Sequence, residues 1–189
     1  MPEDLSQLLK EFGVVRQGHF LLTSGMHSDR YFEKFRILER PNVCEHFARA
    51  LANNFQNMGV TVVCGPTTGG VIVAYEVARQ MGCRCIIAER SETGRKIGRG
   101  FYIGKEDQVL VVDDVLTTGG SIRETLSALE TTGARVVGIG VFIDRSSGVR
   151  FPFPFYAAHR EEIQNYQPDN CPLCRAKVPL EIPGRGERP

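Results

Sequence analysis

The chain has 189 residues, 42% of them hydrophobic, and its 23 basic and 22 acidic residues give a formal net charge of +1. This length and composition predict one domain of ordinary size with a substantial core. A net charge so near zero excludes a global field that would draw the chain to nucleic acid or to an anionic membrane, so any anion site must be local.

The start of the chain carries acidic residues and predicts an amphipathic helix, without the basic start and apolar stretch of a signal peptide. The longest apolar run, residues 136–143, is far shorter than the ~20 residues that cross a membrane as a helix. We therefore expect a soluble, cytoplasmic chain that has neither a membrane nor a nucleic acid among its partners.

The first two segments predict a cap and a helix. Residues 1–40 fit a helix followed by short strands, which we expect to form a small cap, or hood, beside a larger sheet. Next, Val43, Phe47 and Phe55 recur at helical spacing, and Gly59 is placed to end that helix. This helix should bury one face.

From residue 61 onward, apolar strands alternate with helices. Strands are predicted at 61–64, 83–89, 108–113 and 135–144, and helices at 70–81 and 121–131. This alternation predicts an α/β fold with a central, mostly parallel sheet flanked by helices on both faces, and ligands of such sheets bind beyond the carboxyl ends of the strands. Residues 90–100 are polar, basic and glycine-containing, which predicts a mobile loop.

The cysteines predict reduced thiols, because the chain is too long for a small secreted disulfide scaffold. They stand at positions 44, 64, 83, 85, 171 and 174. Cys171 and Cys174 form a C-x-x-C pair that could be half of a zinc site or a redox pair. Cys83 and Cys85 have the wrong spacing for the second half, so the sequence favours a simple turn near the C-terminus.

The strongest functional signal lies at residues 109–129, where an apolar strand ends in Asp113 and Asp114 and a Thr/Gly/Ser-rich turn opens a helix. The turn, 117–121, can present backbone N–H groups and hydroxyls at a helix start, where the helix dipole favours an anion such as a phosphate monoester. The two acids suit a sugar's vicinal hydroxyls or, through them, a magnesium ion. The alternative is a helix cap with solvated strand-end charges.

Two other phosphate-binding patterns are excluded. A nucleotide hydrolase would need a G-x-x-x-x-G-K-[ST] loop, which the chain lacks. A dinucleotide fold would need a glycine-rich turn, but Gly138 and Gly140 lie inside a predicted strand and lack the third glycine. We expect these glycines to allow close packing instead.

Residues 109–129 closely resemble the phosphoribosyl pyrophosphate signature of the type I phosphoribosyltransferases. The resemblance implies that fold, with residues 1–40 as hood, 41–160 as core and 161–189 as a C-terminal extension. It implies that the acids bind the ribose hydroxyls and that the following segment holds the 5-phosphate. The signature comprises Asp113, Asp114, Val115, Leu116, Thr117, Thr118, Gly119, Gly120 and Ser121.

Further segments resemble orotate phosphoribosyltransferases in particular. Residues 23–28, followed by Tyr31 and Phe32, are similar to the segment that lies over orotate in that family. This assigns orotate contacts to Ser24, Gly25 and Thr117.

Residues 65–70 resemble the loop that binds pyrophosphate through Thr67 and Thr68, although alone they are as typical of an ordinary strand-to-helix turn. Arg145, in the pair Asp144-Arg145, matches the arginine that meets the orotate carboxylate; without the resemblance it would be taken for a surface charge.

The resemblance also implies the reaction, in which a pyrimidine nitrogen displaces pyrophosphate from C1 of the ribose. The expected catalytic residues are Asp113, Asp114, Lys96 and Arg99. The phosphoribosyl pyrophosphate site is expected to include Arg90 and Lys96 as well. Magnesium would bind through substrate and water with no direct protein ligand, and the loop 90–100 would reach the neighbouring subunit of a homodimer.

The resemblance has departures and rivals. The loop 90–100 lacks the family's histidine, and Thr23 and Thr68 stand where many members have lysine. A transferase for another base, such as adenine, hypoxanthine, xanthine or uracil, would have no carboxylate for Arg145 to pair. A regulator that senses phosphoribosyl pyrophosphate would need a nucleic-acid surface, and the chain has no DNA-binding helical module or aromatic-interleaved basic patch.

Overall fold

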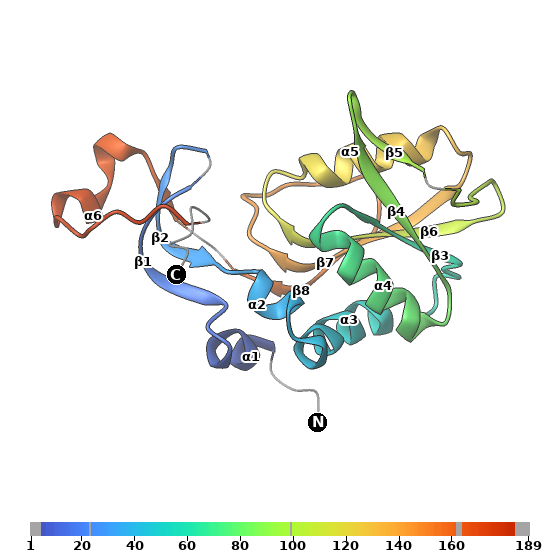
Figure 1. Ribbon diagram of the computed structural model, residues 1–189, viewed down its shortest axis with the longest axis horizontal. Coiled ribbons are helices and arrows are strands. Elements are labelled where there is room, and N and C mark those ends of the chain that lie inside the picture. Colours follow the sequence, from blue (N-terminus) through green and yellow to red (C-terminus); the bar gives the residue numbers. More distant parts are fainter. Residues whose placement is uncertain (1–4, 23, 99, 162–163, 184–189) are drawn as a thin grey trace.

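The computed structural model describes residues 5–22, 24–98, 100–161 and 164–183. Its centre is a six-stranded sheet in the order β5-β4-β3-β6-β7-β8 (Figure 1). All neighbouring strands are parallel except β4 and β5, which confirms the expected mostly parallel sheet. The strands are β3 Val62–Pro66, β4 Arg84–Ser91, β5 Gly94–Ile97, β6 Gln108–Leu116, β7 Arg135–Asp144 and β8 Phe155–Arg160.

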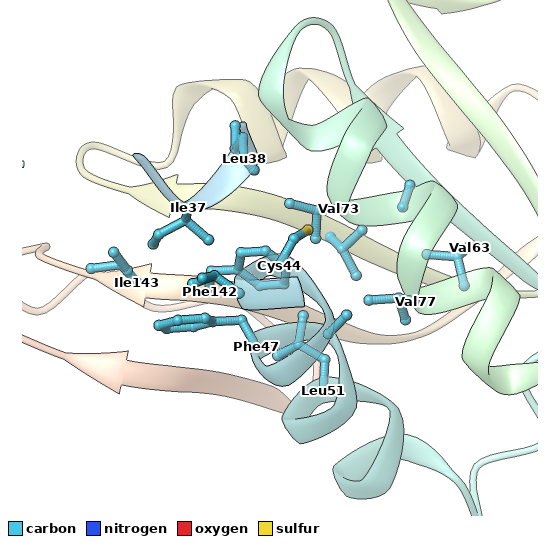
Figure 2. Close-up of a cluster of buried hydrophobic side chains, with 14 of the residues drawn as sticks. Ile37, Leu38, Cys44, Phe47, Leu51, Val63, Val73, Val77, Phe142 and Ile143 are labelled. Atoms are coloured by element: carbon cyan, nitrogen blue, oxygen red, sulfur yellow. The ribbon is translucent and has the colours of Figure 1, made fainter. Parts of the chain in front are cut away.

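Helices cover both faces of this sheet. Successive strand residues point to opposite sides, so a strand of apolar residues has two faces to bury. The helices α3 (Pro41–Phe55) and α4 (Gly69–Met81) share a core with Leu110 and Val112 of β6, whereas α5 (Gly120–Glu130) shares the opposite core with Val109 and Val111. Figure 2 shows Phe47 of α3, Val77 of α4 and Phe142 of β7 converging in the first core. The expected two-faced burial is confirmed.

The paired glycines of β7 sit under α3. A Cβ atom at Gly138 would lie 2.6 Å from the Phe55 ring, and one at Gly140 would lie 3.2 Å from Leu51. Only glycine lets the helix approach the strand this closely, which confirms that the two glycines serve packing and not a dinucleotide turn.

The first part of the chain and the late strand β9 form a separate small sheet, in the order β1-β2-β9, beside the main one (Figure 1). It follows α1, as the sequence predicted for the hood, and it is antiparallel. The remaining elements are α1 Leu5–Glu11, β1 Val15–Leu21, β2 His27–Phe32, α2 Phe35–Leu38, β9 Asn165–Tyr166, the 3-10 helix η1 Pro168–Asn170 and α6 Pro172–Arg175. The strand β9 brings the C-terminal segment back to the hood.

The prediction of an irregular loop at 90–100 is wrong for its first part. The strand β4 continues to Ser91, and β5 pairs with it antiparallel, with Arg90 opposite Arg95. The sequence hid this hairpin because an edge strand exposed to water needs no apolar alternation. Arg99 lies outside the described residues.

In the described part of the chain, no helix is long and apolar enough to cross a bilayer.

Candidate active site

Two carboxylates lie buried at the carboxyl end of β6, in the centre of the main sheet. Asp113 and Asp114 are only 7% and 5% exposed. One oxygen of Asp113 accepts the N–H of Asp114 at 2.9 Å, and Lys34 Nζ lies 2.8 Å from Oδ2 of Asp114. Burial, followed by the neighbouring Asp114 carboxylate, raises the pKa of Asp113 above its usual range, while a hydrogen bond from Ser121 acts in the opposite direction. Burial and the repulsion between the two carboxylates thus outweigh the effects of Ser121 and Lys34 on Asp113, so the pair can accept further donors or a further cation.

The loop after β3 lies directly against these acids, because β3 and β6 are adjacent parallel strands. A Cβ atom at Gly69 would lie 1.7 Å from Oδ2 of Asp114, and one at Gly70 would lie 3.0 Å from Oδ1 of Asp113. The Thr67–Thr68 peptide bond that precedes them is cis. The structure thus brings together the acid pair and the loop 65–70, as their shared sheet edge predicts.

The turn 117–121 connects the acids to α5. Thr117 and Thr118 are exposed, and Gly119 adopts a left-handed conformation with φ 79° at the helix start. A Cβ atom at Gly119 would lie 3.0 Å from Val149, so the turn requires glycine for both conformation and space. No side chain of the described residues caps α5, which leaves the first N–H groups of the helix available to an anion. We call residues 117–121 the phosphate cradle.

Arg95 joins the two loops from the β5 strand. Its guanidinium donates to the Thr67 side chain at 3.2 Å, to the Ala88 carbonyl at 3.0 Å and to Ser121 Oγ at 3.0 Å. Its side chain is only 3% exposed, and Nε lies 3.3 Å from the Glu124 carboxylate. Arg95 therefore fixes the loop 65–70 relative to the phosphate cradle, a role that the sequence did not assign to it.

Arg145 lies at the end of β7, facing the hood. Its backbone N–H donates to the Leu116 carbonyl at 3.0 Å, which aligns it with the end of β6. Its guanidinium carbon lies 5.3 Å from the centre of the Phe32 ring, and burial lowers its pKa while Tyr31 acts in the opposite direction. Among the described residues, no carboxylate lies within 4.0 Å of this guanidinium. Its donors are available to an external carboxylate.

Other predicted site residues lie apart from the acid pair in the single chain. Arg90 and Lys96 are exposed on the β4–β5 hairpin, and no hydrogen bond or ion pair found among the described residues joins them to the acids. Ser24 and Gly25 form the exposed turn between β1 and β2, where Gly25 has φ 80° and donates to the Leu22 carbonyl. Arg99 lies outside the described residues.

Lys34 and the inward-pointing role of Arg95 are features of the site that the sequence does not predict. The ion pair of Lys34 with Asp114 forms where the chain enters α2, at the junction of hood and sheet. No local pattern marks this lysine, since its partner is set by tertiary structure alone. Arg95 differs in that it belonged to the basic stretch, but only the hairpin reveals that it points inward.

Known proteins resemble this chain over most of its length. The model of the phosphoribosyl transferase domain matches residues 36–166. The chain is 44% identical over 183 residues to the orotate phosphoribosyltransferase of Caldanaerobacter subterraneus subsp. tengcongensis, covering 96% of each chain. It is 38% identical over 178 residues to that of Chlorobium phaeobacteroides, covering 94% of this chain and 92% of the relative. The crystal structure of orotate phosphoribosyltransferase from Aeropyrum pernix superposes with a TM-score of 0.73 at 26% identity, covering 83% of this chain and 93% of that one.

Proposed function

The chain belongs to the orotate phosphoribosyltransferases of the phosphoribosyl transferase domain family, and we propose how its residues divide the work of that reaction. The enzyme transfers the 5-phosphoribosyl group from phosphoribosyl pyrophosphate to orotate, which gives orotidine 5′-monophosphate and pyrophosphate in pyrimidine nucleotide biosynthesis. The observation that carries this conclusion is 44% identity along 96% of the chain to an orotate phosphoribosyltransferase. The two buried acids, which are followed in the chain by a helix start without a side-chain cap, agree with this assignment.

The acid pair binds the ribose. Asp113 and Asp114 accept hydrogen bonds from the two ribose hydroxyls, in addition to the donors that the protein supplies. These residues also fit magnesium, because two adjacent carboxylates with a raised pKa at Asp113 favour a hard cation nearby. The ion would be held through substrate oxygens and water, and when bound it would neutralise charge that develops on the departing pyrophosphate.

The phosphate cradle binds the 5-phosphate. The N–H groups at the start of α5 and the hydroxyls of Thr117, Thr118 and Ser121 donate to the phosphate oxygens, supported by the helix dipole. The backbone of Val115 and Leu116 sets the distance between the ribose and the phosphate. Because α5 is fixed to the sheet by its apolar face, the cradle is preorganised.

The leaving pyrophosphate lies against the loop 65–70. Thr67 and Thr68 contact it through backbone and hydroxyl groups, held in place by Arg95. The segment 90–100 of a neighbouring subunit supplies the cations Arg90, Lys96 and Arg99, since Arg90 and Lys96 are exposed at their own sheet edge. A homodimer in which each hairpin completes the partner's site accounts for this outward placement.

Orotate binds between the sheet and the hood. Arg145 offers two parallel donors to the orotate carboxylate, a geometry that a neutral purine cannot use. Ser24, Gly25 and Thr117 contact the base from the hood turn and the cradle. The transferred group passes from pyrophosphate to a ring nitrogen without a protein nucleophile, so positioning and charge stabilisation account for the catalysis.

We place the enzyme in the cytoplasm. All six cysteines are free, as a reducing compartment would keep them.

The assignment is tested by measuring the consumption of orotate, from the change in its absorbance, in the presence of phosphoribosyl pyrophosphate and magnesium. Arg145→Ala should lower kcat/KM for orotate at least about a hundredfold, as expected for an unpaired buried carboxylate, with little change in the KM of phosphoribosyl pyrophosphate. Arg150→Ala, which removes an exposed arginine from the following loop, is the matched control. Equal activity of both variants would refute the role of Arg145.

A further inference from the structure

Four potential metal ligands converge at the far end of the hood, away from the acid pair. His19 of β1, His27 of β2, and Cys171 and Cys174 at α6 each direct one ligand atom to a common point, and these atoms all lie within 4.8 Å of one another. His19 and Cys171 are 1% exposed and His27 is 5% exposed, while Cys174 lies at the surface. This cluster plays no part in the phosphoribosyl transfer described above.

Hydrogen bonding alone does not account for the cluster. His19 Nδ1 lies 2.8 Å from the Val178 carbonyl, which fixes Nδ1 as the protonated nitrogen and leaves a single lone pair on Nε2. That nitrogen has three neighbours: His27 Nδ1 at 2.9 Å, Cys171 Sγ at 3.5 Å and Cys174 Sγ at 3.7 Å. One lone pair cannot accept from three donors, but four lone pairs can share one cation.

The sulfur–nitrogen distances match those between ligands of a tetrahedral zinc ion. Zinc bonds of about 2.0 Å to nitrogen and about 2.3 Å to sulfur place neighbouring ligand atoms about 3.3 to 3.8 Å apart. Three of the four sulfur–nitrogen separations, 3.3, 3.5 and 3.7 Å, fall in this range. The nitrogen–nitrogen separation of 2.9 Å is shorter, so the two rings would move slightly apart around an ion. The hydrogen bond from His19 Nδ1 to the Val178 carbonyl is of the kind that orients the ring of a metal-binding histidine.

We propose that His19, His27, Cys171 and Cys174 form a structural Cys2His2 zinc site. Four protein ligands close the coordination sphere, so the site has no open position for a substrate. The sequence has no second pair of cysteines at the spacing of a zinc site. The second half is a pair of histidines 8 residues apart, with His19 standing 152 residues before Cys171, and only the fold brings them together.

The end of the hood that carries the cluster needs such a link because it has little apolar core of its own, whereas Leu9, Val14 and Phe32 of the hood pack into the core of the main sheet. Between residues 15 and 31 and between 164 and 183, the buried side chains of the described chain are those of His19, Phe20, His27, Ser28 and Cys171, so only Phe20 is large and apolar. Units this small usually depend on a metal or disulfides. The ion would fasten the C-terminal segment, whose Glu181 exchanges backbone hydrogen bonds with β1, to both strands of the hood hairpin. The turn between those strands carries Ser24 and Gly25.

Metal content tests the proposal directly. The full chain, without an affinity tag, is produced in zinc-supplemented medium and dialysed against metal-free buffer. Its zinc content per chain is then measured by inductively coupled plasma mass spectrometry. We expect about one zinc per chain, because closed sites of this ligand set bind zinc tightly at neutral pH. Replacing zinc with cobalt(II) should give the absorption of a tetrahedral ion with thiolate ligands. Wild-type protein without zinc and without the cobalt spectrum, or with a Cys171–Cys174 disulfide in its place, would overturn the proposal.

Variants locate the ion. Cys174→Ser, chosen because Cys174 is exposed, should lower the zinc content at least tenfold and weaken the thiolate–cobalt absorption. Cys83→Ser, which removes a half-buried thiol from the main sheet, should retain both signals. Full zinc content in Cys174→Ser, or equal loss in Cys83→Ser, would place the ion elsewhere and contradict the proposed ligand set. The wild-type cobalt spectrum decides the matter if the serine variant does not fold.

Discussion

Replacing Asp113 with asparagine should make the substrate-free enzyme more stable while it abolishes catalysis. Asp113 is 7% exposed and lies beside the equally buried Asp114, and burial together with that second carboxylate raises its pKa above the usual range. A group whose pKa is raised on folding stabilises the protein below its unfolded pKa, and that contribution is lost as the pH rises through the folded value. At neutral pH, the ionised Asp113 therefore costs stability.

The magnitude follows from the same pKa. Each unit by which folding raises the pKa of Asp113 corresponds to about 1.4 kcal/mol. Even a fraction of that rise makes Asp113→Asn about 1 to 2 kcal/mol more stable than wild type at pH 8. For a chain of 189 residues, this is a rise in Tm of roughly 2 to 8 °C. Asparagine keeps an oxygen that can accept the Asp114 N–H, so the backbone turn should survive.

The assay is thermal unfolding of substrate-free enzyme between pH 5 and pH 8, without magnesium. The Tm advantage of Asp113→Asn should be largest at pH 8 and shrink toward pH 5, while its turnover falls by at least about a hundredfold. Asp169→Asn removes an exposed carboxylate and should leave both properties unchanged. A variant that is less stable than wild type at pH 8, or an advantage independent of pH, would refute this account of the acid pair.

The other predictions concern packing, loop positioning and the hairpin cations. Gly138→Ala should cost about 1 to 3 kcal/mol in urea unfolding, because its Cβ would lie 2.6 Å from Phe55. Arg95→Met should raise the KM for phosphoribosyl pyrophosphate at least tenfold in steady-state kinetics, and an unchanged KM would remove Arg95 from the positioning of the two loops. Lys96→Ala combined with Arg99→Ala should lower kcat far more than it weakens phosphoribosyl pyrophosphate binding by calorimetry; unchanged kcat would contradict that role.

Matched controls exist for these three changes. Gly104→Ala adds a methyl group where the nearest atom is 3.8 Å away, so its stability should equal that of wild type. Arg135→Met removes an exposed arginine at the opposite end of the sheet, and Lys105→Ala with Arg150→Ala removes two exposed cations outside the hairpin. A loss in any control as large as in its test variant would trace the effect to general destabilisation or net charge.

The sequence revealed what depends on local pattern. Near-continuous apolar runs that alternate with helical patterns located β3, β6 and β7 and the helices between them. The change from an apolar strand to acids and glycines marked Asp113 as the start of the site. These features are readable because burial and helix-start chemistry act on residues close together in the chain.

The features that the sequence did not reveal depend on distant parts of the chain. The β4–β5 hairpin is an edge whose polar residues resemble a loop, and Arg95 is buried only because the hairpin folds it over Thr67. The pairing of Lys34 with Asp114 likewise arises from the packing of the hood against the sheet. The histidine–cysteine cluster joins both ends of the chain, so neither half shows its partner in the sequence.

Base selectivity tests the central claim most directly. The enzyme is incubated with phosphoribosyl pyrophosphate, magnesium and an equimolar mixture of orotate, uracil, adenine and hypoxanthine, and the nucleotide products are identified by mass spectrometry. The account predicts orotidine 5′-monophosphate as the product, formed in step with pyrophosphate and lost in Asp113→Asn/Asp114→Asn. A purine nucleotide or uridine monophosphate as the main product, or no nucleotide from any base, would contradict it.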